Sequence, residues 1–129
     1  MAQIGMVRET ALSYDAVLAK LPELLKEEGF GVLTRIDVKA TLKEKIGVDF
    51  RRYQILGACN PKFAHQALSI EPSVGVLLPC NVAVYERDEG GTTVRSIDPM
   101  QTMAAADPRF AQLAKEVQER LARVLSKLG

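Results

Sequence analysis

The chain has 129 residues, the size of one compact domain, and we expect a single domain over residues 1–129. Apolar residues make up 47% of it and charged residues 26%, which excludes the composition typical of disorder. A net charge of +1 gives no electrostatic reason to expect a nucleic-acid partner. No stretch is apolar for long enough to cross a membrane and no signal peptide begins the chain, so we expect a cytoplasmic protein without a membrane partner.

Cys59 and Cys80 are the two cysteines. In a domain of this size without a signal peptide, such a pair indicates reduced thiols in a reducing compartment, with a single disulfide as the alternative. Asn occurs at only two positions and charges of both signs are abundant, a composition that would suit a heat-adapted source.

The first part of the chain predicts two strands and two helices. Alternating and strand-forming residues predict strands over residues 3–9 and 30–37. Apolar residues spaced by three and four predict a helix between these strands, ended by Gly29. Pro22 lies inside that helix and predicts a kink or a break just before it, because proline lacks a backbone donor and clashes with the preceding turn. A short helix over residues 38–46 follows.

The middle of the chain predicts a strand over residues 53–59 and a helix over residues 61–70. Asn60 is among the best N-caps, and Pro61 suits the first helical position. Gly57 is small where a strand normally carries a larger side chain. We expect another part of the protein to pack closely there, with a ligand as the less favoured alternative.

The last part of the chain predicts three strands and the longest helix. Residues 74–78 are apolar on both faces and predict a central strand covered on both sides, and Pro79 predicts a break after it. Two runs over residues 82–87 and 92–97, joined by a Gly-Gly turn, predict an antiparallel hairpin. Asp107 and the proline that follows it predict the start of the long helix. Because it is longer than a small sheet requires, we expect part of its apolar stripe to meet a second subunit.

This order of elements favours an α+β fold. We expect a two-layer sandwich in which helices cover one face of a largely antiparallel sheet, with a long C-terminal helix. A parallel, doubly wound sheet is the alternative, and the hairpin late in the chain counts against it.

Cys59 and His65 form the first candidate pair for chemistry. Cys59 ends a strand just before the N-terminus of a helix, where unpaired backbone donors favour a thiolate if water reaches it; the alternative is a buried, inert thiol. His65 should project back toward the start of that helix and could reach Cys59, as a nucleophile and its base require. The group that would orient the imidazole is not identifiable, with Glu71, Asp98 and the two asparagines as candidates.

Cys80 extends this candidate site, because it also lies at a strand irregularity and is also followed by Asn. If the two strands are neighbours, the thiols of Cys59 and Cys80 could meet beside His65. The ligand spacings typical of zinc or copper sites are missing, so we expect no metal there. Asn60 and Asn81 complete the expected ligand-binding set, although both are also ordinary cap and turn residues.

Three segments resemble one known family. GFGVLTRIDV at residues 29–38, ILGACNPKFAHQAL at residues 55–68 and VGVLLPCNVAVYE at residues 74–86 are similar to the bacterial and archaeal family catalogued as "domain of unknown function 302". The resemblance implies a compact, two-layer α+β domain that forms a homodimer, and it implies no established activity. Pro22 departs from the family pattern. The matching motif positions are Cys59, Asn60, Pro61, His65, Pro79, Cys80 and Asn81.

The sequence leaves three hypotheses of function open. The leading one is a cytosolic homodimer that binds a small molecule, or has a thiol or redox role, at a cleft bounded by Cys59, His65 and Cys80. The second is an enzyme with Cys59 as nucleophile and His65 as base. The third is a structural or oligomerisation module in which all three side chains only pack.

Overall fold

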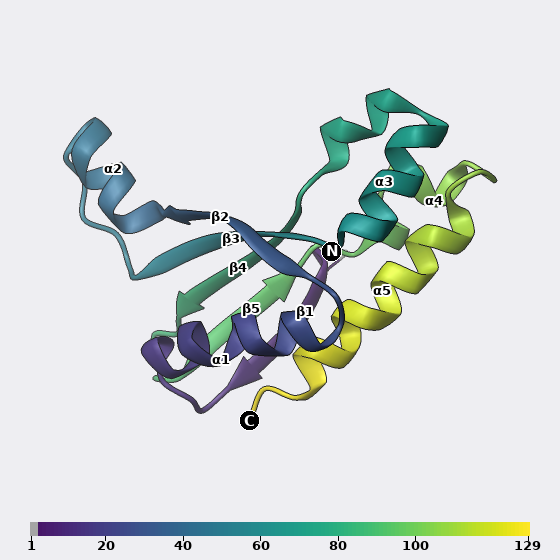
Figure 1. Cartoon of the computed structure of the whole chain (residues 1–129). Coiled ribbons are helices and arrows are strands. Elements are labelled where there is room, and N and C mark those ends of the chain that lie inside the picture. Colours follow the sequence, from purple (N-terminus) through teal and green to yellow (C-terminus); the bar gives the residue numbers. More distant parts are fainter. Residues whose placement is uncertain (1–2) are drawn as a thin grey trace.

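The computed structural model describes residues 3–129 and contains one five-stranded sheet with helices packed on one of its faces (Figure 1). The strands lie in the order β1-β5-β4-β3-β2, and each neighbouring pair is antiparallel. The predicted α+β sandwich is therefore confirmed, and the parallel alternative is wrong. The strands are β1 (Met6–Thr10), β2 (Gly31–Asp37), β3 (Tyr53–Cys59), β4 (Cys80–Glu86) and β5 (Thr92–Ser96).

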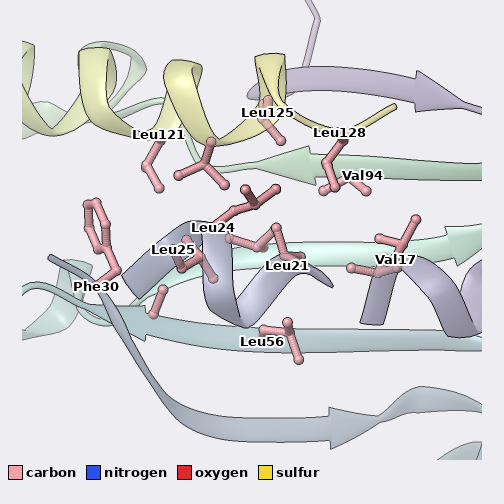
Figure 2. Packing of buried hydrophobic residues seen from close by; sticks show 14 of the residues in the cluster. Val17, Leu21, Leu24, Leu25, Phe30, Leu56, Val94, Leu121, Leu125 and Leu128 are labelled. Atoms are coloured by element: carbon pink, nitrogen blue, oxygen red, sulfur yellow. The ribbon is translucent and has the colours of Figure 1, made fainter. Parts of the chain in front are cut away.

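Helices α1 and α5 form the main covering layer, and the core lies between them and the sheet. Leu21 and Leu25 of α1 are fully buried, together with Leu56 of β3 (Figure 2). Within residues 3–129 no helix is both long and apolar enough to cross a membrane. The helices are α1 (Tyr14–Glu27), α2 (Val38–Ile46), α3 (Pro61–Ile70), α4 (Met103–Ala106) and α5 (Ala111–Ser126), with 3₁₀ helices η1 (Pro72–Leu77) and η2 (Pro99–Gln101).

Helix α1 runs without a break through Pro22, so a break at that position was a wrong prediction. The Ser13 side chain accepts a hydrogen bond from Ala16 N and caps the start of the helix. The helix is held by its buried side, on which Val17 and Leu21 are fully enclosed. Tertiary packing of this side outweighs the unfavourable effect of one proline, because most helical stability in proteins comes from such packing.

Residues 74–78 do not form the covered central strand that their apolar sequence predicts. Residues 72–77 form η1, and Val76 in this helix is 89% exposed. Strand β4 begins only at Cys80, after a cis peptide bond between Leu78 and Pro79. A short apolar run does not distinguish a strand from a helical turn, and here the prolines at both ends limit the run to a single short helix.

Helix α5 begins at Ala111, later than its Asp-Pro signal predicts. The Asp107 carbonyl accepts hydrogen bonds from Phe110 N and Ala111 N, so the segment before the helix is a turn. The apolar stripe of α5 is largely buried inside its own chain, as Leu121 and Val124 show with exposed fractions of 1% and 2%. Because the stripe is buried within its own chain, it gives no reason to expect a second subunit.

A cluster of polar contacts around Glu28, at the end of α1, fixes the position of α5. The Arg123 guanidinium donates to the Glu28 carboxylate at 2.9 Å and lowers its pKa, mainly through this hydrogen bond. Arg120 Nη1 donates to the backbone carbonyl of Glu28 at 3.1 Å, and Asn60 Nδ2 approaches the same oxygen at 3.4 Å. The end of α1, the start of α3 and the middle of α5 are thus held together.

Candidate functional site

An apolar cavity of about 90 Å³ lies next to the ends of β3 and β4 and opens to the surface. Helix α3, the η1 segment, the η2–α4 segment and the first half of α5 provide the remaining walls. Five small side chains leave the space that larger ones would fill. These are Ala58, Ala64, Ala67, Ala104 and Ala114.

Both cysteines line this cavity. The register pairs Ala58 of β3 with Cys80 of β4, and Cys59 follows Ala58 at the end of its strand. Both are free thiols and both are partly buried. The two strands are neighbours in the sheet, which is the condition that the sequence hypothesis set for the thiols to meet.

The Cys80 thiol is held in its neutral form. Burial raises its pKa to about 11, and the nearby Cys59 contributes to the rise because a second thiolate would repel the first. A thiol with a raised pKa is a poor nucleophile and a poor metal ligand at neutral pH, because both roles need the thiolate. Cys80 therefore acts as an apolar wall of the cavity.

Asn60 lines the cavity and caps α3, as its sequence position predicts. Its side-chain oxygen accepts a hydrogen bond from Phe63 N at 3.4 Å, and its amide faces the Glu28 carbonyl. Thr102, the hydroxyl residue of the wall, donates to the Pro99 carbonyl at 2.7 Å. Because both polar side chains already have backbone partners, the cavity offers a ligand mainly apolar contacts.

His65 and Asn81 lie outside the cavity lining. His65 is exposed on α3, whereas the adjacent Ala64 faces the cavity. Asn81 is exposed and pairs with Gly57, so it lies on the sheet face opposite Cys80, as alternation along a strand requires. The structure thus brings together Cys59, Asn60 and Cys80 and leaves the other two candidates apart from them.

The groups considered as partners for the imidazole are engaged elsewhere. The Glu71 carboxylate accepts hydrogen bonds from Ser73, which lower its pKa. Asp98 accepts hydrogen bonds from Met100 N and Gln118 Nε2, both at 2.9 Å. Among residues 3–129, no group of three or more His, Cys, Asp or Glu side chains is placed to hold a metal ion.

Close packing on the opposite sheet face explains why position 57 is a glycine. A side chain at this position would meet the Thr34 side chain and would come within 2.8 Å of Pro79 Cγ. The expectation of close packing at this glycine agrees with these neighbours, which belong to the same chain.

The far wall of the cavity is not evident from the sequence. Ile97, Thr102 and Phe110 reach it from segments that lie more than 35 residues after Cys59. The loop-like sequence around residues 98–110, rich in alanine and methionine, was the available signal, because small residues after a strand leave room beside it. Assigning Ile97, Thr102 and Phe110 to a cavity required the tertiary fold.

Comparison with known proteins assigns the class. The family model described as "Domain of unknown function DUF302" matches residues 6–128. A crystal structure of an uncharacterized conserved DUF302 protein from Bacillus stearothermophilus is similar, with 33% identity and a TM-score of 0.89, covering 99% of this chain and 100% of that chain. No curated protein matches. The chain belongs to the DUF302 family, as its Cys-Asn-Pro and Leu-Pro-Cys-Asn motifs indicated.

Proposed function

We propose that this domain binds a small, uncharged, apolar molecule in the cavity lined by Cys59 and Cys80. The observation that carries the proposal is an open cavity whose wall consists almost entirely of apolar side chains and two free thiols. Ligand sites in proteins are concave and mostly apolar, with few polar groups, and apolar cavities of this kind take up small hydrocarbons. The free thiols are compatible with the cytoplasm as the place of action.

A thiol or redox role at the same cavity is the second candidate. Its support is that Cys59 and Cys80 both line the cavity from adjacent strands, and that Cys59 contributes to the raised pKa of the Cys80 thiol. The enzyme hypothesis, with Cys59 as nucleophile and His65 as base, has less support. His65 is exposed and does not line the cavity that Cys59 faces.

The test is a titration with benzene, followed by NMR of protein labelled at its alanine methyl groups. We expect chemical-shift changes confined to the alanines of the cavity wall. Among the labelled alanine methyl groups, only these contact the bound benzene. Ala67→Leu, which fills the cavity, should abolish these shifts, and Ala64→Leu serves as a second filling variant. Ala122→Leu makes the same change at an exposed helical position and should leave them intact. Unchanged spectra at saturating benzene, or equal shifts in the filled variants, would refute the proposal.

A further inference from the structure

A second hollow lies beside the cavity, along two of the helices that wall it. It is an open groove of about 380 Å³ between α3 and the start of α5, which lie side by side (Figure 1). The residues that line it are Gln66, Ile70, Arg109, Gln112, Leu113 and Glu116. Four of these six are polar, so the groove offers a ligand the polar contacts that the apolar cavity lacks.

Leu113 connects the groove with the cavity, because this residue lines both. It is half-buried, whereas the next residue of α5, Ala114, is buried and lines only the cavity. On α3, Ala67 lines the cavity, and Ile70, about one turn later, lines the groove. The two hollows therefore adjoin along the same pair of helices, and a flexible chain that passes Leu113 can occupy both.

The charged residues of the groove already have partners in their own chain. The Arg109 guanidinium donates to the Asp107 carboxylate at 2.9 Å, and its other terminal nitrogen lies 3.8 Å from the Glu71 carboxylate. The Glu116 carboxylate lies 3.6 Å from the Arg120 guanidinium on the same helix. An ionic group of a ligand would have to compete with these partners and would also lose its own hydration. The groove therefore favours a polar group without charge.

Gln66 and Gln112 are the neutral polar residues of the groove. They come from α3 and α5 respectively, and both are exposed. A glutamine amide both donates and accepts hydrogen bonds, so two such amides suit a group that does the same. A hydroxyl group donates one hydrogen bond and accepts others without carrying a charge. The groove thus matches the polar end of an alcohol better than that of an acid or an amine.

We propose that the ligand of this domain is an aliphatic alcohol, with its chain in the cavity and its hydroxyl group between Gln66 and Gln112. This inference rests on the proposed function and adds the chemical class of the ligand's polar end. The chain leaves water for the apolar wall and passes Leu113, while the hydroxyl group keeps hydrogen-bond partners in the groove. Ligand sites commonly combine a mostly apolar wall with a few polar groups that fix the orientation of the bound molecule.

Titration with hexanol tests this assignment, with NMR of the alanine methyl groups and of the glutamine side-chain amides as the readout. We expect hexanol to shift the alanines of the cavity wall together with the amide signals of Gln66 and Gln112, whereas benzene shifts only the alanines. Hexanoate at pH 7 should bind at least tenfold more weakly than hexanol, because its carboxylate loses hydration without gaining a free cationic partner. Hexanol that leaves both amide signals unchanged would overturn the inference, as would hexanoate that binds as tightly as hexanol.

Exchange of both glutamines for methionine tests the hydrogen bonds separately from the cavity. Gln66→Met with Gln112→Met removes the amides at similar side-chain length and should raise the dissociation constant of hexanol about 25-fold, since each hydrogen bond contributes about fivefold. The affinity for benzene should not change. Lys20→Met, at an exposed position of α1, is the control and should leave both affinities unaltered.

The two ligands distinguish a failure of this inference from a failure of the proposed function. Equal hexanol affinities in the wild type and the double variant, with benzene still bound, would overturn the alcohol assignment alone. A wild-type protein that binds neither benzene nor hexanol would refute the proposed function and this inference with it. The alanine methyl spectrum of each variant without ligand shows that the variant is folded.

Discussion

At the scale of single residues, Cys80 shows how the fold changes the chemistry of a group that the sequence only names. Its position next to a proline and an asparagine suggested a reactive site. In the structure the thiol faces an apolar cavity, and burial keeps it protonated, with a pKa of about 11. The residue is therefore better suited to contact an apolar ligand than to attack one.

The reactivity of Cys80 should follow this raised pKa. We expect its alkylation by iodoacetamide at pH 8 to be roughly 100-fold slower than that of an unfolded-peptide thiol, because a rise of two pKa units lowers the thiolate fraction by that factor. Mass spectrometry of the Cys80 peptide gives the rate, which should still increase above pH 10. A rate that levels off near pH 9 would show an ordinary thiol.

The same pKa predicts a loss of stability at high pH. The unfolded chain releases the Cys80 proton near pH 9.0, whereas the folded chain holds it until about pH 11. The contribution of this thiol to the free energy of unfolding is therefore complete below pH 9 and declines as the pH rises through this window.

At the scale of elements, Pro22 in α1 shows a local preference that the core overrides. Proline in a helix interior removes one backbone hydrogen bond and clashes with the preceding turn. Helix α1 nevertheless continues to Glu27, because its buried side packs against the sheet and α5.

Replacing this proline should stabilise the protein. Pro22→Ala restores the missing donor to the helix, and we expect a gain of about 1 kcal/mol or more in the free energy of unfolding. Urea denaturation gives this value. The control is Ala16→Gly in the first turn of the same helix, which should lower the free energy of unfolding. A lower stability in Pro22→Ala would mean that the proline ring makes packing contacts that outweigh the lost hydrogen bond.

Elements whose ends carry local chemical signals could be predicted from the sequence. Asn60 and Pro61 place the start of α3 correctly, and Asp37 and Gly47 bound α2, because caps and left-handed glycines act within a few residues. The segment around Val76 could not be predicted, since its apolar residues suit a buried strand equally well. The prolines at both ends of this segment, Pro72 and Pro79, limit it to a short helix.

The candidate site was predictable only in part for a related reason. Cys59, Asn60 and Cys80 belong to neighbouring strand ends, and strand pairing brings them together. His65 is close to Cys59 in sequence, but its place on the helix surface depends on which side of α3 meets α5. The inward side of α3 carries Ala67, its buried residue, and Phe63, which packs against the core.

At the scale of the whole molecule, the two sides of the sheet have separate roles in this account. One face is covered by helices and holds the cavity at its end, where small side chains leave space. The other face carries the stacked rings of Tyr53 and Tyr85. The proposed ligand site lies on the helix side of the sheet.

The cavity beside Cys59 and Cys80 should accept an apolar molecule. The most direct measurement is diffraction from a crystal pressurised with xenon, which enters dry apolar cavities. We predict one strong xenon peak in contact with the Cys80 thiol and the alanines of α3 and α5, absent in Ala67→Leu. A cavity without xenon, or one filled by ordered water hydrogen-bonded to the wall, would contradict the account.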